Sequence, residues 1–274
     1  MTSPAATRRA WVESIMGTAM SIHLISKSPT DRLAVDHAVS GCFEELREID
    51  RLFSPYRADS GISKLRRGES AIAELDSRIG EVADSCLAWE RVTGGRFSAH
   101  WQGWFDPTGY VKGWAVEAAA RRHLAPLLAG PGVDAVGVNA GGDLQLFTAE
   151  GSDWSWAVGI ADPARPGEVV ATLDVRNGAV ATSGTAERGH HIIDPRTAQP
   201  ARTVLSATVV ADGLAAADVW ATTAVVAGID DLSWIGDTTT RTGLVVGQGG
   251  EVRRWLGTTE ISTRVAAAPG PALV

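Results

Sequence analysis

A carboxylate and a hydroxyl stand four residues apart at Asp218 and Thr222, within the otherwise apolar run 214–226. On a helix this spacing projects both side chains from one face. Hard oxygen ligands of this kind suit Mg²⁺, which keeps other positions for phosphate oxygens and water. A helix that is apolar nearly all round is buried, and a buried carboxylate needs a partner. The pattern therefore indicates a magnesium site; the alternative is a helix-surface Asp with a Thr that bonds back to the backbone.

A second group of polar residues runs from Ser183 to Pro195. We expect a strand to end at Ser183 and a glycine-containing turn to follow, where hydroxyls and backbone N–H groups can bind phosphate. His191 and Asp194 flank an apolar pair, and a histidine can take a proton from a hydroxyl nucleophile near neutral pH. The alternative for this stretch is a polar hairpin with solvated histidines.

Two further stretches carry glycine beside a polar residue. Lys112 and Gly113 stand at an expected helix start, where Lys is a natural phosphate contact and Gly allows close backbone approach. The alternative there is a glycine-punctuated helix start with a solvated Lys. The segment Asn139-Ala140-Gly141-Gly142-Asp143 is neither a GxGxxG fingerprint nor a Walker A motif, and a plain turn explains it.

Several helices and strands are needed to position these groups. Apolar residues recur at three and four over 31–53, which predicts an amphipathic helix with one core-facing stripe. Further helices are expected at 60–67, 75–92, 112–128 and 214–227, a hairpin arm at 11–26, an irregular loop at 97–109, and strands at 135–138, 154–160, 169–175, 179–182, 206–210, 243–246 and 252–255. This mixture predicts an α+β fold in which mixed sheets are covered by helices. We expect one domain over 1–274, with a disordered tail at 266–274.

Net charge, cysteine content and the length of apolar segments exclude several classes of binding partner. The net charge of −7 argues against a general nucleic-acid or membrane-surface binder, because both partners are polyanionic. Cys42 and Cys86 form no CxxC pair or Cys/His cluster, so zinc is not indicated. No segment reaches the length of a membrane span, and neither a signal peptide nor a lipid-anchor cysteine is recognisable. We therefore expect a cytoplasmic protein.

The ordered motifs resemble one family, the ApbE-type FAD:protein FMN transferases, over about residues 11–230. The matching segments are Met16-Gly17-Thr18, Ser54-Pro55-Tyr56, Asp59-Ser60-Gly61-Ile62-Ser63, Gly95-Arg96-Phe97, Val111-Lys112-Gly113-Trp114-Ala115, Asn139 to Asp143, Thr182-Ser183-Gly184, His191-Ile192-Ile193-Asp194-Pro195, and Ala217-Asp218 with Thr222. The block from Ser183 to Pro195 and the helix carrying Asp218 are the most specific parts.

The resemblance implies an ApbE-like fold, FAD as donor substrate, Mg²⁺ as cofactor, and transfer of FMN to a Thr or Ser of a flavin-carrier protein with release of AMP. It places the metal on the side chains of Asp218 and Thr222 and the backbone carbonyl of Val111. It assigns His191 as the base and Lys112 as a catalytic phosphate contact. Its FAD site comprises Met16, Tyr56, Arg96, Phe97, Ser98, Lys112, Glu117, Ser183, Thr185 and Asp194. Ser98 and Glu117 stand where the family has Asp.

Two other outcomes fit the same residues. With water as the acceptor, the protein would be an FAD diphosphatase that releases FMN and AMP. Without turnover it would be a non-catalytic FAD-binding protein, although mere binding needs no base such as His191.

Overall fold

The computed structural model describes residues 6–185, 189 and 191–261. The expected disordered tail at 266–274 lies outside these residues, as do residues 186–188 and 190, which precede His191 in the sequence. The expected single domain over 1–274 stays a prediction.

A nine-stranded sheet forms the centre of the molecule, and every strand pair in it is antiparallel. Its strands, in spatial order, are β1 (Thr7–Ile15), β2 (Thr18–Ser26), β3 (Ala135–Ala140), β4 (Asp143–Thr148), β7 (Gly178–Gly184), β10 (Val204–Ala211), β11 (Thr242–Gly247), β12 (Val252–Leu256) and β13 (Thr259–Ile261). Two hairpins stand outside it: β5 (Trp156–Ala161) with β6 (Val169–Val175), and β8 (Ile193–Asp194) with β9 (Gln199–Pro200).

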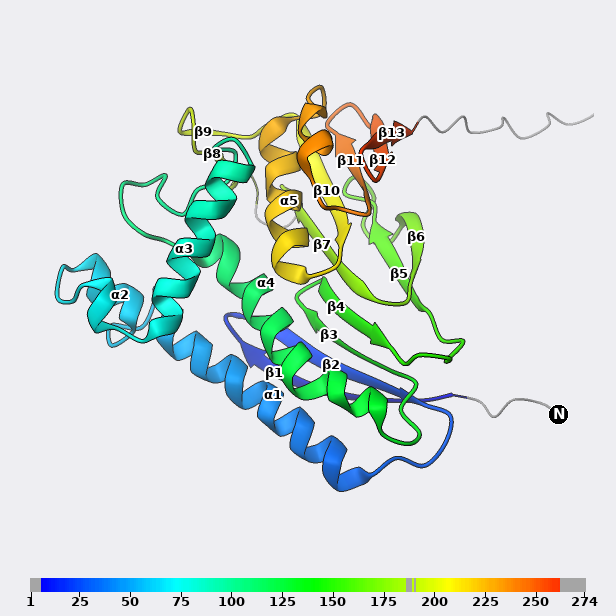
Figure 1. Cartoon of the computed structure of the whole chain (residues 1–274). Helices are drawn as coiled ribbons and strands as arrows, with labels where there is room; N and C mark the ends of the chain where they lie inside the picture. The colour runs from blue at the N-terminus through cyan, green and yellow to red at the C-terminus, as the bar shows by residue number, and fades with distance from the viewer. Residues whose placement is uncertain (1–5, 186–188, 190, 262–274) are drawn as a thin grey trace, which may run out of the picture.

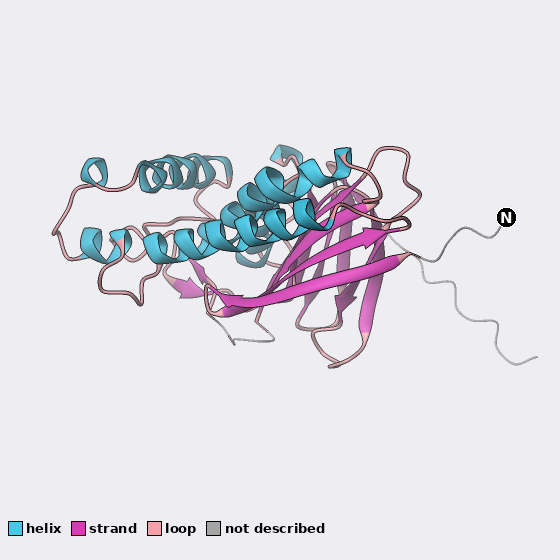
Figure 2. Cartoon of the chain, turned by 90° about the horizontal axis from the view of Figure 1, so that it is seen from below, coloured by secondary structure: helices cyan, strands magenta, loops and turns pink. Residues whose placement is uncertain are grey.

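The helices lie on one side of this sheet (Figures 1 and 2). They are α1 (Arg32–Phe53), α2 (Gly61–Arg66), α3 (Ser77–Val92), α4 (Thr108–Ala119) and α5 (Leu214–Ala227), with short turns η1 (Ile72–Glu74), η2 (Ala120–Leu124), η3 (Ala125–Ala129) and η4 (Ser233–Asp237). Helices α1, α4 and α5 pack over the strands, whereas α2 and α3 lie beyond the strands, to the left in Figure 1. The α+β class, with helices covering a sheet, is confirmed.

The β5–β6 hairpin covers part of the opposite face. Val209 of β10 belongs to the core beneath the helices, whereas its neighbour Val210 packs in a second cluster with Trp156 and Val175 of the hairpin. Successive strand residues point to opposite faces of a sheet, so the central strands are buried on both sides. This burial extends to the two polar residues of β10, Ser206 and Thr208, which are buried with its apolar residues.

Local sequence signals explain most element boundaries. The β1–β2 turn consists of Met16 and Gly17, both with positive φ (53° and 71°), as a two-residue hairpin turn requires. Helix α1 begins after Asp31, whose side chain accepts a hydrogen bond from the Ala34 backbone N–H. Helix α5 ends at Gly228, where φ is +88°.

Several elements differ from expectation: β1 begins at Thr7, before the expected hairpin arm, and strands β9 and β13 were not expected. The helix expected at 112–128 begins earlier, at Thr108, and gives way after Ala119 to a π-helical turn and a 3₁₀ turn. Pro126 has no N–H for an α-helical hydrogen bond, which accounts for the change near that end. Strand β4 was not expected, because its second face carries the polar side chain of Gln145, which is fully buried.

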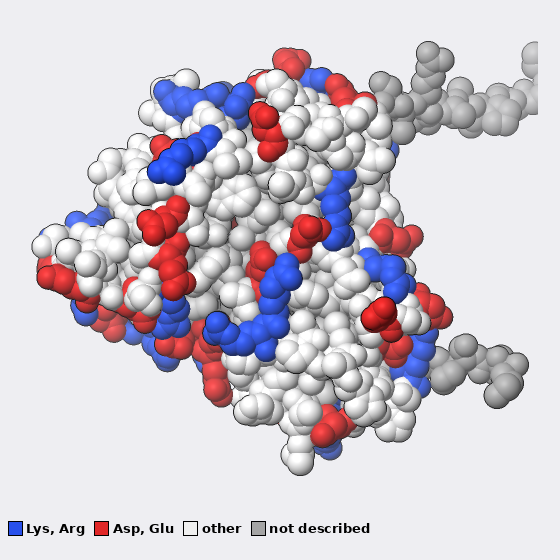
Figure 3. Space-filling view, viewed as in Figure 1, with Lys and Arg blue, Asp and Glu red and all other residues white. Residues whose placement is uncertain are grey.

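Within the described part of the chain, no helix combines the length and apolarity needed to cross a membrane. Figure 3 shows acidic and basic side chains interspersed over the helical face rather than gathered by sign.

Candidate functional site

Helices α4 and α5 make a close contact at Gly113. A Cβ atom on this residue would lie 3.0 Å from the Leu214 carbonyl oxygen and 3.3 Å from the Asp218 Cβ. Only glycine lets the two backbones approach this closely without displacement. The contact therefore sets Lys112, the preceding residue, beside Asp218.

Lys112 stands between two carboxylates. Its ammonium donates to Asp143 and, over 3.1 Å, to Oδ2 of Asp218. The carboxylates come from different elements, Asp143 from the start of β4 and Asp218 from α5. The side chains of Asp143 and Asp218 are 10% and 13% exposed, and that of Lys112 is 29% exposed. The three charges thus form a largely enclosed group, in which two negative charges face one positive charge.

Burial and charge act in opposite directions on these groups. Burial lowers the pKa of Lys112, but the charges of Asp218 and Asp143 outweigh it, and the pKa is raised. Burial raises the pKa of Asp218, against the attraction of Lys112 and with the repulsion of Asp143. Lys112 therefore carries its proton across the physiological range, whereas the pKa of Asp218 is raised above its ordinary value because burial and Asp143 outweigh the attraction of Lys112.

The end of β7 joins the same group. Oδ1 of Asp143 accepts a hydrogen bond from the Thr182 backbone N–H over 2.9 Å. The next residue, Ser183, has its Oγ 3.0 Å from Oγ1 of Thr222. The structure thus brings together Lys112, Asp143, Asp218, Ser183 and Thr222, which we call the Lys112 cluster.

The donor atoms of the Lys112 cluster suit a hard cation. Two carboxylates and two hydroxyls are the oxygen ligands that Mg²⁺ prefers. No group of three His, Cys, Asp or Glu side chains able to hold a metal occurs over residues 6–185, 189 and 191–261. Val111 is buried in the first turns of α4, directly before Lys112. The residues present therefore fit Mg²⁺.

The half-buried Glu117 and the buried Gln145 fix the N-terminus of α5. Glu117 Oε2 accepts from the Ala215 backbone N–H over 3.1 Å, and Gln145 Oε1 accepts from the Leu214 N–H over 2.9 Å. These N–H groups have no partner within the helix, and a carboxylate there also favours the helix dipole. Glu117 was expected in the FAD site. One of its carboxylate oxygens binds the N-terminus of α5, the helix that carries Asp218.

A second charged group lies where the loop after α3 meets the β8–β9 hairpin. Arg96 donates to Asp231 over 2.7 Å, and Arg196 donates to Asp194 over 2.8 Å. The Arg196 side chain also packs against Gly95, 3.6 Å from where a Cβ would lie. The hydrogen bond from Arg196 lowers the pKa of Asp194, and the Arg96 charge contributes to the shift. We call Arg96, Asp194, Arg196 and Asp231 the Arg96 cluster.

The other expected site residues differ in burial and in their hydrogen-bond partners. Phe97 is buried, and Ser98 donates to Glu90 Oε2 over 2.9 Å. Tyr56 is 96% exposed, a conspicuous position for an aromatic ring. Met16 forms the β1–β2 turn described above.

The remaining two expected site residues are Thr185 and His191. Thr185 is buried, and its N–H donates to the Leu205 carbonyl over 2.9 Å. His191 is exposed, with its Nδ1 3.1 Å from the Gly189 carbonyl oxygen. Among the described residues, no hydrogen bond links His191 to the Lys112 cluster.

Asp143 of the Lys112 cluster was not assigned from the sequence, nor were Arg196 and Asp231 of the Arg96 cluster. The segment of Asp143 was noticed, but a plain turn explained it adequately. The signal was the carboxylate directly after the paired glycines, where Gly141 and Gly142 adopt positive φ (64° and 102°) and turn β3 into β4. The partners of Asp143 are distant in sequence, so the local pattern did not reveal them.

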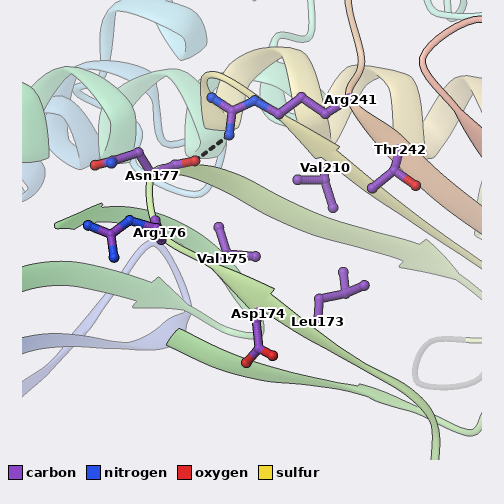
Figure 4. A pocket seen from close by; sticks show the side chains of 8 residues that line it. All are labelled: Leu173, Asp174, Val175, Arg176, Asn177, Val210, Arg241 and Thr242. Atoms are coloured by element: carbon purple, nitrogen blue, oxygen red, sulfur yellow. Dashed lines mark hydrogen bonds between the residues drawn. The ribbon is translucent and has the colours of Figure 1, made fainter. Parts of the chain in front are cut away.

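A pocket of about 480 Å³ opens elsewhere, beside β6 (Figure 4). Arg241 reaches over it and donates to the Asn177 carbonyl and to Asp212. Its lining includes Val210, from the sheet face that β5–β6 covers, and it shares no residue with either cluster. The pocket is therefore separate from the expected chemistry.

Solved structures share the fold. The crystal structure of an ApbE protein from Thermotoga maritima matches with a TM-score of 0.75 at 22% identity, covering 90% of this chain and 97% of that one. The flavin transferase ApbE from Vibrio cholerae matches with a TM-score of 0.68 at 18% identity, covering 92% and 98%. The flavinyl transferase ApbE from Pseudomonas stutzeri matches with a TM-score of 0.70 at 16% identity, covering 93% and 97%. The expected ApbE-like fold is thereby confirmed.

Sequence comparison identifies the family of the chain as well as its fold. A protein from Rhodobacter capsulatus named FAD:protein FMN transferase is 38% identical over 174 residues, which cover 60% of this chain. The match takes in 31% of that protein, so it spans about a third of the relative's length. The ApbE family profile matches residues 16–104 and 99–243, which together make up most of the sequence. The chain therefore belongs to the ApbE family.

Proposed function

We propose that this protein is a magnesium-dependent FAD:protein FMN transferase. It cleaves FAD and attaches the FMN half through a phosphoester to a Thr or Ser of a flavin-carrier protein. The observation that carries the proposal is the Lys112 cluster, which combines a cation, two carboxylates and two hydroxyls in one enclosed group. The name of the Rhodobacter capsulatus relative supports the same reaction.

The reaction exchanges one phosphorus–oxygen bond for another. The acceptor hydroxyl oxygen bonds to the phosphorus on the FMN side of the pyrophosphate, and the bond from that phosphorus to the bridging oxygen breaks. AMP leaves with the bridging oxygen, while the hydroxyl proton passes to a base. The enzyme therefore has to bind the pyrophosphate, position the acceptor hydroxyl and accept a proton.

Asp218, Thr222 and the Val111 carbonyl would hold the magnesium ion. When bound, Mg²⁺ supplies charge neutralisation on the pyrophosphate oxygens. Lys112 adds a fixed positive charge at the same place, since its ammonium stays protonated between the carboxylates. Enclosure strengthens both effects, because charges interact more strongly away from bulk water.

His191 is the proposed base. Its Nδ1 lies within hydrogen-bond distance of the Gly189 carbonyl. A proton on Nδ1 that is donated to this carbonyl leaves the lone pair on Nε2, which is the form able to accept a proton. The ring is exposed, as a base must be if its substrate is the hydroxyl of another protein.

The rest of the FAD site is proposed along the Arg96 cluster and the end of β7. Its residues are Met16, Tyr56, Arg96, Phe97, Ser98, Glu117, Ser183, Thr185 and Asp194. Tyr56 offers an almost fully exposed ring on which a flavin or adenine could stack.

The test is the intact mass of a purified flavin-carrier protein after incubation with this enzyme, FAD and Mg²⁺. A gain of one FMN unit supports the transferase. Free FMN and AMP with an unmodified carrier would indicate the diphosphatase, and stoichiometric FAD retention without products would indicate mere binding. An Asp218→Ala variant that modifies the carrier at the wild-type rate would refute the metal assignment.

A further inference from the structure

We propose that Asp143 is a positioning residue that draws the Lys112 ammonium away from Asp218 and so leaves Asp218 free for a divalent cation. The inference rests on the magnesium site proposed above and adds Asp143 as a residue that controls the affinity of this site for the metal. In this arrangement Lys112 and the metal compete for the Asp218 carboxylate. Asp143 favours the metal because it binds the Lys112 ammonium.

The competition follows from the contacts of Lys112. Its ammonium is 3.1 Å from Oδ2 of Asp218, the same carboxylate that would take the metal. Two cations cannot share a largely enclosed carboxylate at contact distance without strong repulsion. Metal binding therefore requires the ammonium to move off Asp218 or to be held by another anion.

Asp143 is that other anion, and it is fixed in place. One of its oxygens contacts the Lys112 ammonium, while Oδ1 accepts from the Thr182 backbone N–H over 2.9 Å. It begins β4 and pairs with Ala140 across the β3–β4 hairpin, so its backbone is also held. A carboxylate anchored in this way can keep the Lys112 ammonium bound while Asp218 binds a metal cation.

The charge balance supports this division. Two carboxyl groups face the one ammonium, so Lys112 can keep Asp143 as its partner when Asp218 binds another cation. When a metal binds Asp218, the ion pair with Asp143 would still hold the Lys112 ammonium in place. Without the Asp143 charge, Asp218 is the one remaining carboxylate partner that the structure gives Lys112, and the metal has to displace it.

The test compares Mg²⁺ affinity across a double-mutant cycle of Asp143→Asn and Lys112→Met. Titration calorimetry with MgCl₂ alone, without FAD or carrier, measures the affinity directly. The Asn side chain retains an oxygen that can accept from the Thr182 N–H, so it removes the charge and keeps the anchor. The matched control is Asp153→Asn, which removes the carboxylate partner of Lys27 far from either cluster.

We expect Asp143→Asn to weaken Mg²⁺ binding about tenfold or more, since neighbouring charges in a partly enclosed site interact by more than the ~1.4 kcal/mol that a tenfold change represents. Adding Lys112→Met should restore the affinity to at least the wild-type value. Asp153→Asn should leave it unchanged.

Three results would overturn the inference. Equal Mg²⁺ affinity of wild type and Asp143→Asn would show that Asp143 does not control the site. An equal loss in the Lys112→Met background would show that Asp143 acts without Lys112, for example as a ligand itself. A wild-type protein that binds no Mg²⁺ would reject the metal site of the proposed function, and the inference with it.

If Asp143→Asn does not fold, as judged by its circular dichroism, Lys112→Met alone carries the test. Removal of the competing ammonium should tighten Mg²⁺ binding. Unchanged or weaker Mg²⁺ binding would show that Lys112 and Mg²⁺ do not compete for Asp218.

Discussion

Replacing Gly113 by alanine adds a Cβ atom where α4 and α5 are in closest contact. The added atom would lie 3.0 Å from the Leu214 carbonyl oxygen and 3.2 Å from the Ala215 Cα, both of them backbone atoms of α5. Overpacking of this kind costs ~1–3 kcal/mol, whereas alanine is favoured over glycine within a helix by ~0.5–1 kcal/mol. We therefore expect a net loss of about 1 kcal/mol in unfolding free energy, and a fall in Tm of about 2–4 °C.

Gly80, within α3, is the matched control. A Cβ there would meet only the Ile72 Cγ2, at an ordinary 3.7 Å. Gly80→Ala should therefore stabilise the protein by ~0.5–1 kcal/mol through helix propensity alone. Thermal unfolding followed by circular dichroism compares the two variants. If Gly113→Ala stabilises as much as Gly80→Ala, helices α4 and α5 are not held in close contact, and the placement of Lys112 beside Asp218 loses its basis.

Three more expectations follow from the contacts. Glu117→Gln weakens the anchor at the N-terminus of α5 and should lower the unfolding free energy by about 1 kcal/mol, measured by urea unfolding. The hydrogen bond from Ser233 and the charge of Arg96 lower the pKa of Asp231 from its ordinary 3.8 to about 2. The stability lost in Asp231→Asn should therefore be constant above about pH 5 and should diminish as the pH falls from 3.8 toward 2, in urea unfolding over a pH series. Burial raises the pKa of both cysteine thiols to about 12, so neither should react with Ellman's reagent at about pH 8 until the protein unfolds; rapid reaction of the native protein would show that they are accessible.

The helices were predictable because their patterns are local. Helix α5 matches its expected range at both ends, since an apolar run closed by Gly228 leaves little ambiguity. Helix α1 follows from one regular apolar stripe and the capping residue Asp31. The spacing of Asp218 and Thr222 likewise predicted that both side chains of the proposed metal site lie on one face of α5.

What the sequence did not reveal depends on contacts between distant segments. Gln145 breaks the apolar pattern of β4, and its burial makes sense only with Leu214 and Gly178 as hydrogen-bond partners. Asp143 resembles an ordinary turn residue until the fold sets it against Lys112. A third such contact is the pairing of Arg96 with Asp231, which joins positions far apart in the chain.

The most direct test of the central claim is the intact mass of a flavin-carrier protein incubated with the wild-type enzyme and FAD, in parallel samples with Mg²⁺ and with excess EDTA. We predict a gain of one FMN unit on the carrier in the Mg²⁺ sample alone, with AMP released in equal amount. A carrier that stays unmodified in both samples, or gains FMN equally in EDTA, would contradict magnesium-dependent transfer at the Lys112 cluster.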